Sequence, residues 1–143
     1  MRIKKWKLGI LLPFWLAQCT NLYFSETMVT ETTPDDGQLN VQCSTSVAVS
    51  FNEPMSKDTI FGNHDATTDC FGTIQISDDD FATCAPFNGD PLASDNDTKF
   101  IFYPNISLLS GSTYKIKVTN LVSSAEGKNM SSDYTQVIGF LVK

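Results

Sequence analysis

The side chains that could support catalysis are one histidine, the serines and four cysteines in a chain of 143 residues. His64 is the only imidazole, which excludes zinc proteases and other metal sites that need two histidines. It lies between Asn63 and Asp65 in a polar stretch, and the sequence contains no GxSxG or SxxK motif for an activated serine. Because a serine or thiol nucleophile needs a base beside it, we expect no catalytic residues and no enzymatic activity.

Three consecutive aspartates, Asp78, Asp79 and Asp80, are the candidates for binding a metal ion. Carboxylate oxygens suit calcium, but this run lacks the alternate-residue spacing and the final glutamate of an EF-hand loop. We therefore favour solvated loop acids over a metal site and expect no cofactor. Calcium binding at these three residues is the alternative.

The amino-terminal residues have the pattern of an export signal. Met1–Lys7 is basic, and Leu8–Ala17 is an apolar run of about ten residues, whereas a transmembrane helix needs about 20. Pro13 would also interrupt a helix through this run. We assign residues 1–18 to a signal peptide and exclude them from the folded domain.

The signal ends in Leu16-Ala17-Gln18-Cys19, which resembles a bacterial lipobox. In such signals the cysteine becomes the acylated amino terminus. The resemblance implies that Cys19 is a lipid anchor, that its acyl chains bind the membrane, and that residues 19–27 are a tether. Gln18 departs from the usual Gly, Ala or Ser, so cleavage of an ordinary signal near Ala17 and an uncleaved anchor are the alternatives. All three interpretations export the chain.

The remaining cysteines, Cys43, Cys70 and Cys84, would meet an oxidising compartment after export. Three thiols allow at most one intramolecular disulfide. Cys70–Cys84 is the preferred pair, because it closes a loop of about 15 residues and would contribute about 3 kcal/mol. A disulfide that uses Cys43 and three reduced thiols are the alternatives. A zinc site is not expected, since no CxxC spacing occurs.

The charge of the chain excludes another class of partner. The formal net charge is −6, but four of the ten basic residues lie within residues 1–7. The rest of the chain has six basic and sixteen acidic residues, a net charge of −10. Such a body repels phosphate backbones, so we expect no nucleic-acid partner.

From Met28 onward the chain consists of short runs with strand patterns, separated by turn residues. In one of them Tyr114, Ile116 and Val118 alternate with polar residues, as in a strand that is buried on one face. We expect strands at Met28–Thr32, Ser46–Phe51, Thr73–Ser77, Phe81–Ala85, Lys99–Tyr103, Thr113–Asn120 and Gln136–Val142, with a short extra segment at Thr59–Phe61. Seven strands in a domain over residues 28–143 are typical of an all-β, Ig-like sandwich with Greek-key connections.

Most aromatic side chains are expected in the core, because they alternate with polar neighbours inside these strands. This set is Phe51, Phe81, Phe100, Phe102, Tyr103, Tyr114 and Phe140. Phe61, Phe71 and Phe87 lack this pattern, and exposure of any of them beside the aspartates would indicate a binding surface.

Five motifs, in the family's order and spacing, resemble the bacterial Ig-like domain of the S-layer (SbsA) type. They are the opening segment Val29–Gly37, the pair Asn40-Val41, the strand end Val49–Met55, the strand Thr98–Pro104 and the strand Leu109–Val118. The resemblance covers nearly all of residues 29–142 and implies the Ig-like sandwich. The stretch from Cys70 to Cys84 is similar to a cysteine-containing variant of this domain in small exported lipoproteins of spirochaetes.

The resemblance implies a function without catalysis. We expect a lipid-anchored protein of the cell envelope, at the outer membrane, whose Ig-like module is structural or adhesive and presents loops to a protein or glycan partner. A module that binds calcium or a small ligand is the alternative. Little chain is left over for a catalytic insertion, which is a further reason to expect no enzyme.

Overall fold

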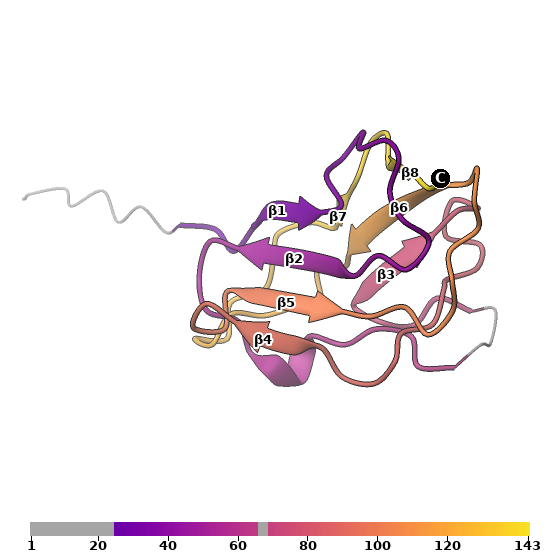
Figure 1. Cartoon of the computed structure of the whole chain (residues 1–143). Helices are drawn as coiled ribbons and strands as arrows, with labels where there is room; N and C mark the ends of the chain where they lie inside the picture. Colours follow the sequence, from indigo (N-terminus) through magenta and orange to yellow (C-terminus); the bar gives the residue numbers. More distant parts are fainter. Residues whose placement is uncertain (1–24, 66–68) are drawn as a thin grey trace, which may run out of the picture.

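The computed structural model describes residues 25–65 and 69–143, which form two β-sheets packed face to face (Figure 1). The elements in chain order are β1 (Val29–Thr33), β2 (Val47–Phe51), the 3-10 helix η1 (Lys57–Thr59), β3 (Ile74–Ser77), β4 (Leu92–Ser94), β5 (Lys99–Phe102), β6 (Thr113–Val118), β7 (Tyr134–Thr135) and β8 (Phe140–Leu141). No helix in these two ranges is long and apolar enough to cross a membrane.

The strand order is that of an immunoglobulin-type sandwich. One sheet has the order β1-β2-β5-β4, and in the other β6 pairs with β3, β7 and β8. Every pair of strands is antiparallel. With β7 and β8 taken as two halves of one last strand, this order matches the seven strands of a constant-type Ig domain. The predicted all-β, Ig-like sandwich is therefore confirmed.

The core lies between the sheets and follows from the alternation along the strands. Val47, Val49 and Phe51 of β2 point inward, and so do Phe100 and Phe102 of β5. The facing sheet contributes buried residues from three of its strands: Ile74, Ile76, Tyr114, Ile116, Val118 and Phe140. Edge-to-face contact of the Phe51 and Phe100 rings, whose centroids are 6.2 Å apart, adds aromatic packing.

Two of the aromatic residues predicted for the core lie outside it. Tyr103 is 49% exposed, and Phe81 is only half-buried beneath Lys117, whose Nζ lies 5.5 Å from the ring centroid. Phe87, which had no clear pattern, is buried against Phe102 with ring centroids 4.9 Å apart. Phe71 is exposed.

The strand predicted at Phe81–Ala85 is wrong. Asp80 and Phe81 have φ angles of 60° and 65°, in the left-handed region that ends a strand. The segment instead turns, and its Ala85 N–H donates to the carbonyl of Ile76. The fourth strand of the sandwich is β4, which was not predicted, and the extra segment at Thr59–Phe61 is not a strand because it begins at the end of η1.

A disulfide joins Cys70 to Cys84, whose Cα atoms are 5.1 Å apart, and this is the pairing that the sequence favoured. It holds the loop before β3 against the turn that follows β3. Cys43 is the free cysteine of the described residues, and its Sγ–H donates to the carbonyl of Lys143 at 3.1 Å.

Replacing both disulfide cysteines, Cys70→Ser with Cys84→Ser, is expected to lower the free energy of unfolding by about 2–3 kcal/mol, because the bond restricts the unfolded chain. Urea denaturation measures this loss. Cys43→Ser is the matched control and should change stability much less. Equal losses in the two proteins would contradict the prediction.

Candidate functional site

The last strand of the sandwich is interrupted, and the interruption creates an exposed surface. The sequence predicted one strand over Gln136–Val142, but in the structure β7 ends at Thr135, just before this range, and β8 lies near the end of the range. Both halves pair with β6, and Gln136 N–H still donates to the carbonyl of Ile116, while residues 137–139 leave the sheet between the halves. The prediction of a continuous strand is therefore wrong.

A carboxylate far away in the sequence causes this interruption. Asp36 accepts three backbone hydrogen bonds, from the N–H groups of Val137 at 2.9 Å, Ile138 at 2.8 Å and Gly139 at 2.7 Å. Gly139 has a φ of 84°, a conformation that favours glycine, and its carbonyl accepts from Gly37 N–H at 2.7 Å. A regular strand would direct alternate N–H groups to β6, whereas here three consecutive N–H groups are turned toward Asp36.

The buried side chain of Gln136 holds the residue that precedes the loop 137–139 in place. Its Nε2 donates to Thr32 Oγ1 and to the carbonyl of Pro34, each at 2.9 Å, and its Oε1 accepts from Ile116 N–H at 3.1 Å. Thr32 belongs to one sheet and Ile116 to the other. The amide therefore joins the two sheets at the point where the last strand breaks.

Together these contacts display three aliphatic side chains, which we name the apolar ridge: Leu39, Val137 and Ile138. Val137 is 80% exposed, and Ile138 and Leu39 are each 65% exposed. The segment that carries Leu39 runs alongside β8, because Leu141 N–H donates to the carbonyl of Gln38 and Val41 N–H donates to the carbonyl of Leu141. Exposed aliphatic side chains on two neighbouring segments of fixed backbone indicate a contact surface for another molecule.

The hydrogen bonds at the ridge also change the acidity of Asp36. Partial desolvation raises the pKa of Asp36, but the three N–H groups and the nearby Lys115 lower it by a larger amount. The pKa therefore lies below its ordinary value of 3.8. The carboxylate form is therefore the one that holds the loop.

The aspartates considered for calcium do not converge on one point. Asp79 is occupied by the protein itself: it accepts from Ser77 Oγ–H at 2.7 Å, Thr83 N–H at 2.9 Å and Thr83 Oγ1–H at 2.6 Å. The hydroxyl of Ser77, followed by the donors of Thr83, lowers the pKa of Asp79 to about 2. Within residues 25–65 and 69–143, no three acidic, histidine or cysteine side chains are grouped to hold a metal. Asp78 and Asp80 instead line a shallow hollow with Lys115.

The other residues singled out by sequence have simple surroundings. His64 lies on the surface, where its Nε2 is 3.8 Å from the Oδ1 of Asp90. Cys19 lies outside the described residues. Neither the ridge nor Asp36 was predicted as a site. The only local signal is Gly139 after two β-branched residues, and it does not identify Asp36 as the partner.

Comparison with known proteins supports the fold. A family model described as the bacterial Ig-like domain matches residues 25–141. No curated protein matches the chain.

Among solved structures, the S-layer protein rSbsC is similar with a TM-score of 0.55 and 17% identity over 81% of this chain. The N-terminal part of SbsC is similar with a TM-score of 0.54, also at 17% identity, over 77% of this chain. The chain spans only 13% of the first structure and 22% of the second. At this identity the similarity shows the fold alone.

Asp36→Asn is expected to lower the free energy of unfolding by about 1 kcal/mol at neutral pH, because the amide is a poorer acceptor for three N–H groups. Since folding lowers the pKa of Asp36, its contribution is present above pH 3.8 and is lost as the pH falls through the lower folded-state pKa. Urea denaturation of both proteins at neutral and strongly acidic pH measures this.

Asp35→Asn is the control, since Asp35 is adjacent and exposed. If it cost as much as Asp36→Asn, or if the difference between Asp36→Asn and the unaltered protein persisted at acidic pH, the assigned role of Asp36 would be wrong.

Proposed function

The chain belongs to the bacterial Ig-like domain family, and from this we propose that it is a non-enzymatic protein of the cell envelope. In this proposal the chain is exported, Cys19 carries the acyl chains, and the sandwich presents the apolar ridge to a protein partner. The observation that carries the proposal is the display of Leu39, Val137 and Ile138 by the Asp36 and Gln136 hydrogen bonds.

A structural role is supported by how the carboxylates are used. Asp36, Glu53 and Asp79 each accept hydrogen bonds from the protein's own donors, and for each of them the pKa is lowered. A general acid needs a raised pKa, and a nucleophile or base needs an unoccupied face. These three groups are suited to holding loops in place rather than to proton transfer.

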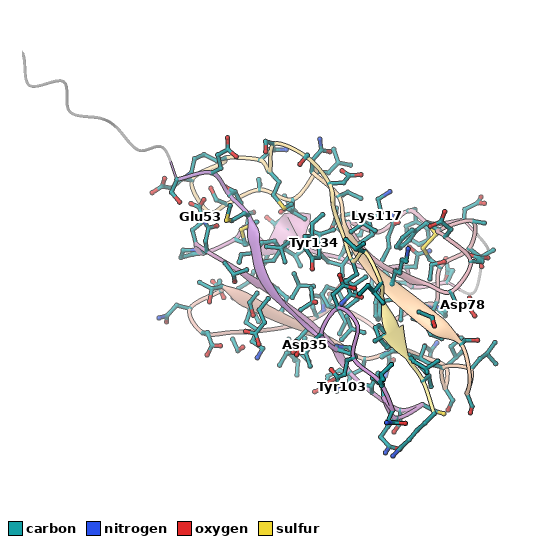
Figure 2. All side chains as sticks on the ribbon, turned by 90° about the horizontal axis from the view of Figure 1, so that it is seen from above. Asp35, Glu53, Asp78, Tyr103, Lys117 and Tyr134 are labelled. Carbon is teal, nitrogen blue, oxygen red and sulfur yellow. A yellow bond between two sulfur atoms is a disulfide. The ribbon has the colours of Figure 1, made fainter. Side chains whose placement is uncertain are left out.

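The way the chain joins the sandwich determines the length of a tether from Cys19. Thr27 Oγ1–H donates to Glu53 Oε1 at 2.7 Å, and Lys128 Nζ lies 3.0 Å from Glu53 Oε2. The Nδ2 of Asn52 donates to the carbonyl of Glu26 at 2.7 Å. Figure 2 shows Glu53 beside the point where the chain reaches the sandwich, and Asp78 toward the opposite end. Residues 25–27, which the sequence assigned to the tether, are therefore fixed to the domain.

This attachment limits how far the domain can lie from the membrane. Between Cys19 and Ser25 an extended chain reaches at most about 20 Å. β1 then runs from this end of the sandwich toward the other, and the turn that contains Asp36 follows it (Figure 1). A domain held by Cys19 would thus have one end close to the lipid surface, with the ridge farther along the sandwich from that end.

A protein partner fits the ridge better than a glycan. Leu39, Val137 and Ile138 offer no hydrogen-bonding groups in their side chains, whereas sugar hydroxyls require donors and acceptors. An apolar groove on another protein would bury this surface, and each Å² of apolar area buried would contribute about 25 cal/mol to the free energy of binding. The two acidic neighbours, Asp35 and Asp36, favour basic residues at the rim of that groove.

Anchoring is tested by Cys19→Ala in the full chain. We expect the variant to lose fatty-acid labelling and to move from the membrane fraction to the soluble fraction, because no acyl chains are attached. Cys43→Ala is the control and should remain labelled. A Cys19→Ala protein that still carries the label would refute the lipid anchor.

Presentation of the ridge is tested with a photo-crosslinking amino acid at position 137 in intact cells. We expect a specific crosslinked protein that is lost when Ile138→Ser is added. Position 121 is the control, since Leu121 is 66% exposed but lies outside the ridge. The same adducts from both positions, or none from position 137, would argue against a partner at the ridge.

A further inference from the structure

The outer face of the sheet β1-β2-β5-β4 is defined by the register of its strands. The inward residues of β2 and β5 fill the core, so the alternate residues point outward. The pairing places Thr33, Ala48, Ile101 and Leu92 in one outward row across the four strands. The next row contains Glu31, Ser50, Lys99 and Ser94.

The first row and its surroundings make an apolar area on this face. Leu92 is 58% exposed, and Ile101 beside it is half-buried. Tyr103, which follows Ile101 by two residues and so extends the same face, is 49% exposed. The two central positions have short side chains: Ala48 is buried among its neighbours and Ser50 is half-buried, so neither rises above the rows beside it.

The second row carries one acidic and one basic side chain. Glu31 lies on β1 and Lys99 on β5, with Ser50 of β2 between them. Strands are about 4.8 Å apart, so the Cα atoms of Glu31 and Lys99 are separated by about 10 Å. Among the residues that the structure describes, neither forms an ion pair. The face therefore has an unpaired negative charge and an unpaired positive charge at the same height along the strands.

From this arrangement we infer that the face binds a second copy of the chain. A two-fold axis that runs along β2 in the plane of the contact places Glu31 of each copy opposite Lys99 of the other. The same axis brings Ser50 against Ser50 and Ala48 against Ala48, and places Thr33 opposite Ile101. A face with one charge of each sign on either side of a central strand is complementary to itself under this rotation.

The contact is expected to be weak and reversible. A stable interface buries about 800 Å² on each partner, and four short strands offer less than this. The inference does not rest on the ridge or on Cys19, since it uses neither.

Charge exchange tests the pairing. The segment used is residues 25–143, because it contains both sheets and the whole described core. Analytical ultracentrifugation at concentrations up to about 1 mM measures its association, and circular dichroism checks that each variant is folded. We expect a concentration-dependent dimer, and Glu31→Lys or Lys99→Glu alone should raise its Kd about tenfold, because two attractions become repulsions. The double exchange should restore the dimer. A mixture of the two single variants should form a heterodimer.

Crosslinking tests the axis in the full chain in intact cells. Ser50→Cys in a Cys43→Ser background should form a disulfide-linked dimer on mild oxidation. Thr135→Cys, on the outer face of the other sheet, is the control and should not. The inference would be overturned if the protein were monomeric at all concentrations. It would also be overturned if the Kd of the dimer were the same in the single charge variants as in the unaltered protein. A crosslink from Ser50→Cys to a different protein would assign the face to that partner instead.

Discussion

The buried amide of Gln136 is the interaction on which the arrangement of this sandwich depends. It donates to Thr32 and to the carbonyl of Pro34 on one side, and accepts from Ile116 on the other. Burial of an amide lowers the stability of a protein unless its donor and acceptor groups form hydrogen bonds. Here the Nε2 of Gln136 bonds the β1 side and its Oε1 bonds the facing sheet. The amide therefore fixes where β1 ends, and with it the position of the turn that supplies Asp36.

Once that turn is placed, the Asp36 carboxylate determines the shape of the last strand. Its three N–H partners cannot also bond β6, so β7 and β8 are separated and Val137 and Ile138 face the solvent. Two polar side chains thus create an apolar surface. The core residues make the sandwich stable, but they do not explain why aliphatic side chains are exposed at this place.

The molecule separates its surfaces by role. The bonds of Asn52, Glu53 and Lys128 fix the point where the chain joins the domain, and the ridge lies beyond the far end of β1. The outer face of the sheet that contains β2 remains free for a further contact. The Cys70–Cys84 disulfide holds the loops beside β3, so the acidic turn at Asp79 is held from two sides.

Local patterns in the sequence determined the sandwich: alternation identified most strands, and the turn residues separated them. The disulfide pairing favoured by loop length is also the one present. The errors arose where distant residues decide the local conformation. Asp36 acts on the last strand from about 100 positions away, and Asp79 turns a segment that alternates like a strand. β4 is a strand only because β5 lies beside it. Short-range patterns carry no information on such partners, so only the tertiary structure could place the ridge and the outward rows.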